Sequence, residues 1–160
     1  MGNVVIRDFE RGDLDGYIEM SESFFSSCAV LHPVPHEHIT RTFEECLRKN
    51  PLLRGLILEI EKVVAGYALL SFTWSNEAGG PCVLIEEVYV IPGFRGEGAG
   101  SALLRFVEGE YGDKASRFRL EVTRTNDSAI RLYERRGYER LDYLQMVKDC
   151  NTNSRSTGCF

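Results

Sequence analysis

Apolar residues in the first half of the chain recur at spacings that predict a strand and two helices. Residues 3–10 form a short β-branched run, and residues 14–25 then place apolar side chains three and four positions apart. Asp13 precedes that helical pattern and is its candidate N-cap. Residues 29–38 contain two prolines and indicate a loop, after which a second helical face ends before Pro51.

The middle of the chain has the alternating pattern of strands. Apolar positions alternate at the start of residues 55–74, a polar Glu61-Lys62 pair interrupts them, and a longer apolar run follows. This pattern predicts an antiparallel hairpin. Residues 75–81 form a second turn, and residues 82–92 predict another strand.

The remaining elements follow a glycine-rich loop at residues 93–100. A helical pattern begins at Ala99, and residues 117–123 form a strand-like run. A further helix extends from Asn126 to Gly137, which stands where a left-handed residue would end it. Residues 138–148 predict a last strand.

Together these elements predict one α+β domain over residues 1–148. We expect a mostly antiparallel central sheet of about six to seven strands, flanked by about four helices, with one strand–loop–helix–strand crossover. Residues 149–160 are polar and patternless, and we expect a flexible tail there. No internal repeat or interdomain linker divides the chain.

Composition narrows the class of protein. The 160 residues are 43% hydrophobic and 27% charged, which is enough apolar material for a packed core. The net charge is −5 and the basic residues are scattered, so we expect no nucleic-acid partner and a site that favours cationic substrates. The N-terminus lacks a signal core and no apolar stretch approaches 18 residues, so we expect a cytoplasmic protein without a membrane partner.

Cysteine and histidine give little support to metal or disulfide chemistry. The five cysteines form no CxxC pair, so we expect them to be reduced. His32, His36 and His38 fall in the proline-containing loop, where solvated histidines are expected. We therefore predict no metal.

The glycine loop is the strongest chemical signal in the sequence. Gly93, Gly96, Gly98 and Gly100 fall within eight positions and lead into a helix, whose N-terminal N–H groups and dipole attract anions. Arg95 adds a charge suited to phosphate. A tight turn needing positive φ is the alternative explanation, although one glycine would satisfy it.

Two common nucleotide motifs fit the loop poorly. Ser101 and Ala102 follow the last glycine, so the lysine of a P-loop is absent. The glycines at 96, 98 and 100 miss the G-x-G-x-x-G spacing, although Glu121 lies about 20 residues further on, where a ribose-binding acid is expected. Binding of NAD in a Rossmann-like site therefore stays as an alternative.

The segment "VYVIPGFRGEGAGSALL" resembles the R/Q-x-x-G-x-G/A acyl-CoA-binding motif of the GCN5-related N-acetyltransferase (GNAT) superfamily, with Arg95, Gly98 and Gly100 at the motif positions. The segment "TRTNDSAIRLYERRGYER" is similar to the family's downstream Asn…Tyr…Gly-Phe/Tyr region. The chain is also similar to the diamine and thialysine acetyltransferases, which carry a Leu-Glu-Asp type triplet where Ile85-Glu86-Glu87 stands here.

The resemblance implies an enzyme that moves an acetyl group from acetyl-CoA, its co-substrate, to a primary amine by direct attack. It also implies a cofactor site in which the backbone of the strand and the glycine loop contact CoA. The residues concerned are Val88, Tyr89, Val90, Arg95, Gly96, Glu97, Gly98, Ala99, Gly100, Ser101 and Asn126. Glu97 departs from the usual pattern, because it puts a negative charge inside a phosphate-binding loop, and Asn126 could equally be a helix N-cap.

Catalysis of this kind needs a base and an acid. An amine with a pKa of about 10.4 must lose a proton before it attacks, and Glu86 or Glu87 could accept that proton. Neighbouring strand residues face opposite sides, so only one should reach the cleft unless the strand bulges, and Glu86 is slightly favoured. Tyr133, which could also be a core aromatic, is by resemblance the donor to the departing thiolate.

Substrate recognition is assigned to the first two helices, their loop, Phe72 and Trp74, together with whichever of Glu86 and Glu87 binds a second ammonium group of the substrate. A small-molecule amine, polyamine- or lysine-like, is the first hypothesis. Acetylation of a protein N-terminus or lysine and a CoA- or nucleotide-binding sensor without catalysis are the alternatives. A homodimer is the common outcome for domains of this kind.

Overall fold

The computed structural model of the chain describes residues 2–150. Its centre is a single sheet in the order β1-β2-β3-β4-β5. The first three strand pairs are antiparallel and the pair β4-β5 is parallel. The strands are β1 (Val4–Asp8), β2 (Leu53–Ile60), β3 (Val63–Ser75), β4 (Gly80–Val90) and β5 (Arg117–Leu120).

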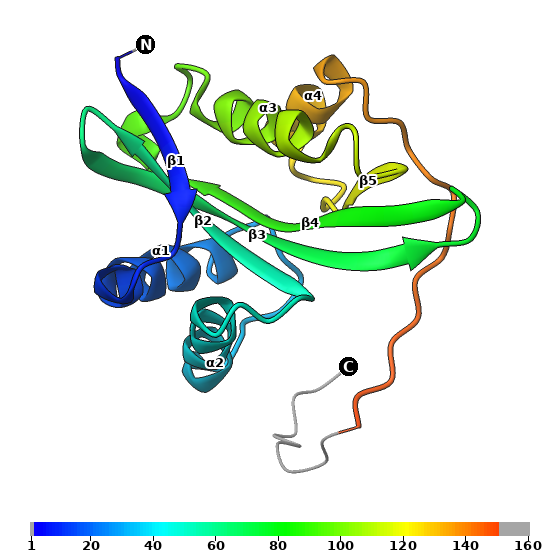
Figure 1. Cartoon of the computed structure of the whole chain (residues 1–160), viewed down its shortest axis with the longest axis horizontal. Coiled ribbons are helices and arrows are strands. Elements are labelled where there is room, and N and C mark those ends of the chain that lie inside the picture. Colours follow the sequence, from blue (N-terminus) through cyan, green and yellow to red (C-terminus); the bar gives the residue numbers. More distant parts are fainter. Residues whose placement is uncertain (1, 151–160) are drawn as a thin grey trace.

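Helices cover both faces of this sheet (Figure 1). One face carries α1 (Leu14–Phe25) and α2 (His36–Leu47), and the other carries α3 (Ala99–Tyr111) and α4 (Asp127–Arg135). Two short 3-10 helices, η1 (Arg11–Asp13) and η2 (Pro92–Phe94), precede α1 and the glycine loop. The crossover from β4 through α3 to β5 is the connection that parallel neighbours require.

Each face has its own core. On the α3 face, aliphatic residues such as Leu70, Ile85 and Leu103 form the buried cluster. On the α1 and α2 face the cluster is largely aromatic, and the ring of Tyr17 meets that of Tyr67 edge-on at 5.1 Å between centroids. Such edge-to-face pairs stabilise a core beyond their buried area.

The α+β class, the four helices and the crossover are confirmed, and Gly137 has the left-handed φ of 85° expected at the end of α4. The strand count is five in the described part of the chain instead of six to seven. Residues 138–148 form no strand, and Leu144 there is 90% exposed. A strand exists only where a neighbouring strand pairs with it, and within residues 2–150 no strand pairs with this segment.

Smaller predictions were also wrong. Asp13 does not cap α1 with its side chain, because its carboxylate accepts from the Glu10 N–H at 2.7 Å and pairs with Arg7 at 2.7 Å. Helix α2 begins at His36, so His36 and His38 lie in its first turn rather than in the preceding loop. Strand β5 ends at Leu120, before the predicted Thr123.

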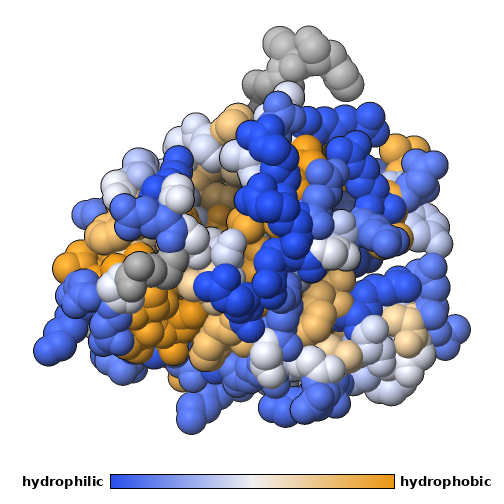
Figure 2. All heavy atoms as spheres, turned by 90° about the horizontal axis from the view of Figure 1, so that it is seen from above, coloured by the Kyte–Doolittle hydropathy of each residue, from blue (hydrophilic) through white to orange (hydrophobic). Residues whose placement is uncertain are grey.

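Most of the predicted tail at residues 149–160 cannot be compared with the structure, because residues from 151 onward lie outside the described part of the chain. No helix within 2–150 is long and apolar enough to cross a membrane. Seen from above, the molecule presents mainly hydrophilic side chains, with apolar surface gathered at one end and in recesses (Figure 2).

Two glycines of the loop before α3 have left-handed backbone. Gly96 has a φ of 83° and Gly98, the N-cap of α3, a φ of 87°. A Cβ added at Gly96 would meet nothing within 4 Å, so backbone conformation alone requires glycine there. Gly100 has a different reason, since a Cβ would press on Leu132 of α4 at 3.3 Å.

We predict that Gly96→Ala lowers the free energy of unfolding by about 1–2 kcal/mol, because alanine resists the left-handed region. Gly93→Ala is the matched control. A Cβ at Gly93 also meets nothing within 4 Å, and its φ is not left-handed. Urea unfolding of both variants measures the difference, and equal stabilities would contradict the backbone explanation.

Candidate active site

The site begins where two neighbouring strands separate. Strand β4 pairs with β5 only from Cys82 to Ile85. On its other edge, β4 stays paired with β3 as far as Val90. Within the described residues, the outer edge of β4 from Glu86 onward therefore has no strand partner.

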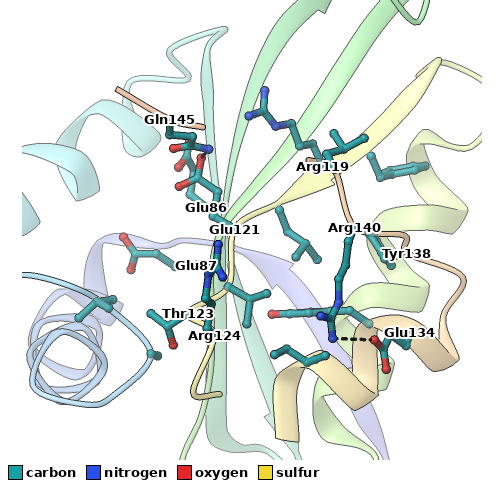
Figure 3. Close-up of a pocket in the computed structure, with 18 of the residues that line it drawn as sticks. Glu86, Glu87, Arg119, Glu121, Thr123, Arg124, Glu134, Tyr138, Arg140 and Gln145 are labelled. Carbon is teal, nitrogen blue, oxygen red and sulfur yellow. Dashed lines mark hydrogen bonds and ion pairs between the residues drawn. The ribbon is translucent and has the colours of Figure 1, made fainter. Parts of the chain in front are cut away.

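An irregularity at the same place puts two carboxylates on one face. Leu70 opposes Ile85 while Leu69 opposes Glu87, so Glu86 is an extra residue in β4. Such a bulge turns adjacent side chains toward the same side of a sheet. The Ser71 hydroxyl donates to Glu86 Oε1 at 2.5 Å, and both glutamates extend toward the side of the sheet that carries α1 (Figure 3).

Glu87 is the half-buried member of the pair and Glu86 the exposed one. The Tyr67 hydroxyl donates to Glu87 Oε2 at 2.5 Å. Burial raises the pKa of Glu87 to about 7, the Tyr67 hydrogen bond opposes that rise, and the charge of Glu86 adds to it. A carboxylate with such a pKa exchanges protons readily at neutral pH.

The glutamates line a cavity of about 2040 Å³. Its other walls are the end of α1 with the following loop, β5, α4 and the segment after α4. Tyr133 of α4 also lines it, and burial raises the pKa of this phenol, which keeps it protonated at neutral pH. The cavity thus combines a proton acceptor with a proton donor.

Charged groups of both signs surround this space. Arg140 pairs with Glu134 at 3.3 Å near α4, and Gln145 donates to Glu121 at 2.5 Å near Glu86 (Figure 3). The Thr123 hydroxyl donates to the Cys28 carbonyl at 2.7 Å and so ties the loop after α1 to the segment after β5. The three acids Glu86, Glu87 and Glu121 all belong to the cavity wall.

The glycine loop lies at the end of β4 and does not line the cavity. No side chain caps α3, so its first N–H groups are free of a side-chain partner. Glu97 is exposed in this loop. Arg95 instead folds back on β4, where its Nε donates to the Val90 carbonyl at 2.7 Å and its guanidinium lies 5.4 Å from the Tyr89 ring centre.

Comparison with known proteins identifies this arrangement. The model of the acetyltransferase (GNAT) family matches residues 16–138. The chain belongs to the GNAT acetyltransferase family. A thialysine N-epsilon-acetyltransferase from Sus scrofa is 30% identical over 151 residues, covering 86% of this chain and 85% of that protein.

Two further comparisons agree. The thialysine N-epsilon-acetyltransferase of Mus musculus is 33% identical over 118 residues, covering 65% of this acetyltransferase and 69% of its relative. The solved structure of an aminoglycoside N-acetyltransferase in complex with CoA has a TM-score of 0.76 at 17% identity, covering 94% of this chain and 97% of that one. At that identity the likeness concerns the fold.

The structure does not bring all predicted site residues of the acetyltransferase together. Phe72 and Trp74 do not line the cavity. Phe72 lies on the α3 face, 5.3 Å from Tyr111 between ring centres, because it is one position out of phase with Ser71. Trp74 lies near the β3–β4 turn and is 67% exposed.

Other residues have a local role or were not predicted. Asn126 is the N-cap of α4, and its side chain accepts from the Ala129 N–H at 3.3 Å. Tyr67 and Ser71, which bind the two glutamates, were missed because Tyr67 looks like any core aromatic in an apolar run. The shift of apolar residues from Val83 and Ile85 to Val88 and Val90 was the available signal for the bulge.

The histidines do not gather at the cavity. His36 Nδ1 lies 3.0 Å from Glu22 Oε1, a contact between α2 and α1. His32 alone of the three lines the cavity. Over residues 2–150, no group of three or more acids, cysteines and histidines could hold a metal ion.

The raised pKa of Glu87 makes the stability of the fold depend on pH. The native state binds more protons than the unfolded state between pH 4.5 and about 7, so this contribution is full below that range and is lost as pH rises through about 7. We predict that Glu87→Gln removes the loss. Relative to the unmodified protein, the variant should gain on the order of 3 kcal/mol between pH 4.5 and 8.

Urea unfolding at several pH values measures this gain. Glu86→Gln is the control, because that side chain is exposed. Because this variant keeps Glu87, its stability should follow that of the unmodified protein with pH, and the difference between the two should change little. A Glu87→Gln variant whose stability stays parallel to that of the unmodified protein would mean that Glu87 is not buried as an ionisable group.

Proposed function

We propose that this acetyltransferase moves an acetyl group from acetyl-CoA to a primary amine of a small molecule, with a polyamine- or lysine-like acceptor favoured. The observation that carries the proposal is the carboxylate pair at the bulge, in which half-buried Glu87 has a pKa of about 7 and exposed Glu86 stands beside it. This pair lies in one cavity with a protonated phenol, Tyr133.

Two features support acetyl-CoA as the donor. The open outer edge of β4 at Val88 to Val90 could pair with the amides of the pantetheine arm, as an added strand would. The N-terminus of α3, preceded by left-handed Gly96 and Gly98 and without a side-chain cap, suits a pyrophosphate. Bound acetyl-CoA would supply the acetyl group as a thioester. At Gly96 the left-handed φ is by itself a sufficient reason for glycine. The argument that this loop binds phosphate therefore depends on the N-terminus of α3.

The acceptor amine arrives as an ammonium ion and must lose a proton. Glu87 supplies the base, because its carboxylate is partly protonated at neutral pH and so can both accept and release a proton. The sequence favoured Glu86 slightly, and the burial of Glu87 supports the opposite assignment. Tyr133 remains protonated and supplies the proton that the departing thiolate needs.

Glu86 then has a separate part in recognition. Its side chain is exposed, accepts a hydrogen bond from the Ser71 hydroxyl at 2.5 Å and places a carboxylate beside the base. An acceptor with a second ammonium group could pair with it while its first amine meets Glu87. The names of the two thialysine acetyltransferases agree with this class, since thialysine is an amino acid with an amine on its side chain.

Release of the CoA thiol, measured with spermidine, putrescine, thialysine, lysine, aminoglycosides, amino-acid amides and short peptides, tests the proposal. We expect turnover with the diamines or lysine-like amines, and binding of acetyl-CoA in calorimetry. Tight binding without turnover on any small amine would favour a protein acceptor or a sensor. Failure to bind acetyl-CoA, or preference for NAD, would overturn the proposal.

We predict that Tyr133→Phe lowers kcat by about 100-fold or more, because a positioned acid typically contributes 10²–10⁴-fold. Tyr111→Phe is the matched control. Tyr111 lies on the α3 face, where it accepts a hydrogen bond from Arg54, and it does not line the cavity. Equal kcat values for the two variants would exclude Tyr133 as the acid.

A further inference from the structure

The interior of the α1 and α2 face holds a phenol that the mechanism above does not use. Tyr67 of β3 is 0% exposed, and its ring packs against Tyr17 of α1 and Tyr89 of β4. Its hydroxyl donates to Glu87 Oε2 at 2.5 Å. A buried phenol cannot turn to water for another partner, so this hydrogen bond costs free energy to break.

We propose that Tyr67 is a positioning residue of the reaction: its hydroxyl fixes one oxygen of Glu87, favours the ionised form of the carboxylate and leaves the other oxygen for the acceptor amine. This inference rests on the proposed function for its catalytic meaning. Its physical content, the control of Glu87 by Tyr67, can be tested without turnover.

The geometry supports a fixed carboxylate. Tyr67 pairs with Tyr89 in the β3–β4 ladder, two positions from the pair Leu69–Glu87. Both the donor and the acceptor therefore lie on adjacent, hydrogen-bonded strands of the sheet, where the backbone is held on the β3–β4 ladder. Within residues 2–150, Glu87 Oε1 makes no hydrogen bond, so only Oε2 is held.

Among the groups around Glu87, the Tyr67 hydroxyl is the one that favours the ionised form of the carboxyl. The titratable groups that face Glu87 are Tyr67 on β3, Glu86 on β4, Tyr17 on α1 and Cys46 on α2. None of these is a cation, and Glu86 opposes ionisation. Burial and the charge of Glu87 raise the pKa of Tyr67 well above its usual value, so the phenol stays a donor throughout the working pH range.

Protein groups also fill the space behind the phenol. Ser21 of α1 is 0% exposed, and its hydroxyl lies close to the hydroxyls of Tyr17 and Tyr67 without forming a hydrogen bond. Solvent therefore does not compete for the Tyr67 hydroxyl. Helix α1, whose end lines the cavity, therefore shields the Tyr67 hydroxyl from solvent.

The test compares Tyr67→Phe with Tyr17→Phe. Phenylalanine keeps each ring and removes one buried hydroxyl, and only the first variant loses the bond to Glu87. The protein is labelled with ¹³C at the glutamate side-chain carboxyls, and the Glu87 signal is assigned by its loss in Glu87→Gln. A plot of the chemical shift of that carbon against pH gives the midpoint of the titration of the Glu87 carboxyl group directly.

We expect the Glu87 midpoint to rise by about one pH unit in Tyr67→Phe and to stay near 7 in Tyr17→Phe. The acidic limb of kcat/KM should move with it. At pH 7 kcat/KM should fall about fivefold, and at pH 9 it should return to near the unmodified value. A purely structural defect would lower kcat/KM equally at every pH.

A second variant covers the case in which Tyr67→Phe does not fold. 3-Fluorotyrosine at position 67 keeps the ring and makes the phenol a stronger donor, so the Glu87 midpoint should move below that of the unmodified protein. An unchanged midpoint in both variants would overturn the inference. Absence of turnover with every amine would refute the proposed function, while the carbon signal would still decide the role of Tyr67.

Discussion

The site depends on one extra residue in a strand. With Glu86 inserted opposite the Leu69–Leu70 step, the apolar side chains of β4 that face α3 change from Val83 and Ile85 to Val88. Both halves of the strand can then pack on the same helix, while the inserted residue and its neighbour face the opposite side. The ladder with β5 ends at Ile85, the residue just before the bulge. One local irregularity therefore produces both the carboxylate pair and the open strand edge.

A carboxylate in such a place opposes folding. Burial of Glu87 beside an aromatic cluster favours its neutral form, and the charge of Glu86 increases that preference. The Tyr67 hydroxyl offsets part of this cost, and the resulting pKa lies near neutrality rather than at either extreme. Active sites commonly contain titratable groups whose pKa values are strongly shifted by their surroundings. The aromatic cluster on the α1 side therefore packs the core and also sets the pKa of Glu87.

The glycine loop has a mixed origin. Gly96 and Gly98 both have left-handed backbone, which alone explains the glycine at Gly96, and at Gly100 the packing of α3 against α4 favours glycine. A ligand is therefore not needed to explain these glycines, although the sequence argument took their number as a sign of one. What remains in favour of an anion is the end of α3, which lacks a side-chain cap and follows the open edge of β4 directly.

The sequence by itself determined the class of the fold, the four helices, four of the strand positions closely, and the family, because these follow from local periodicity and from two motifs of fixed spacing. Tertiary structure decided the rest. Whether Glu86 and Glu87 share a face depends on the pairing of β3 with β4. The shift of apolar positions along β4 indicates a bulge, but only the register of the two strands places it at Glu86. Residues 138–148 have strand-like composition, yet they remain outside the sheet, because a strand needs a pairing partner and composition does not record one. Tyr67 acquires its role only because strand pairing brings it to a carboxylate 20 residues away along the chain.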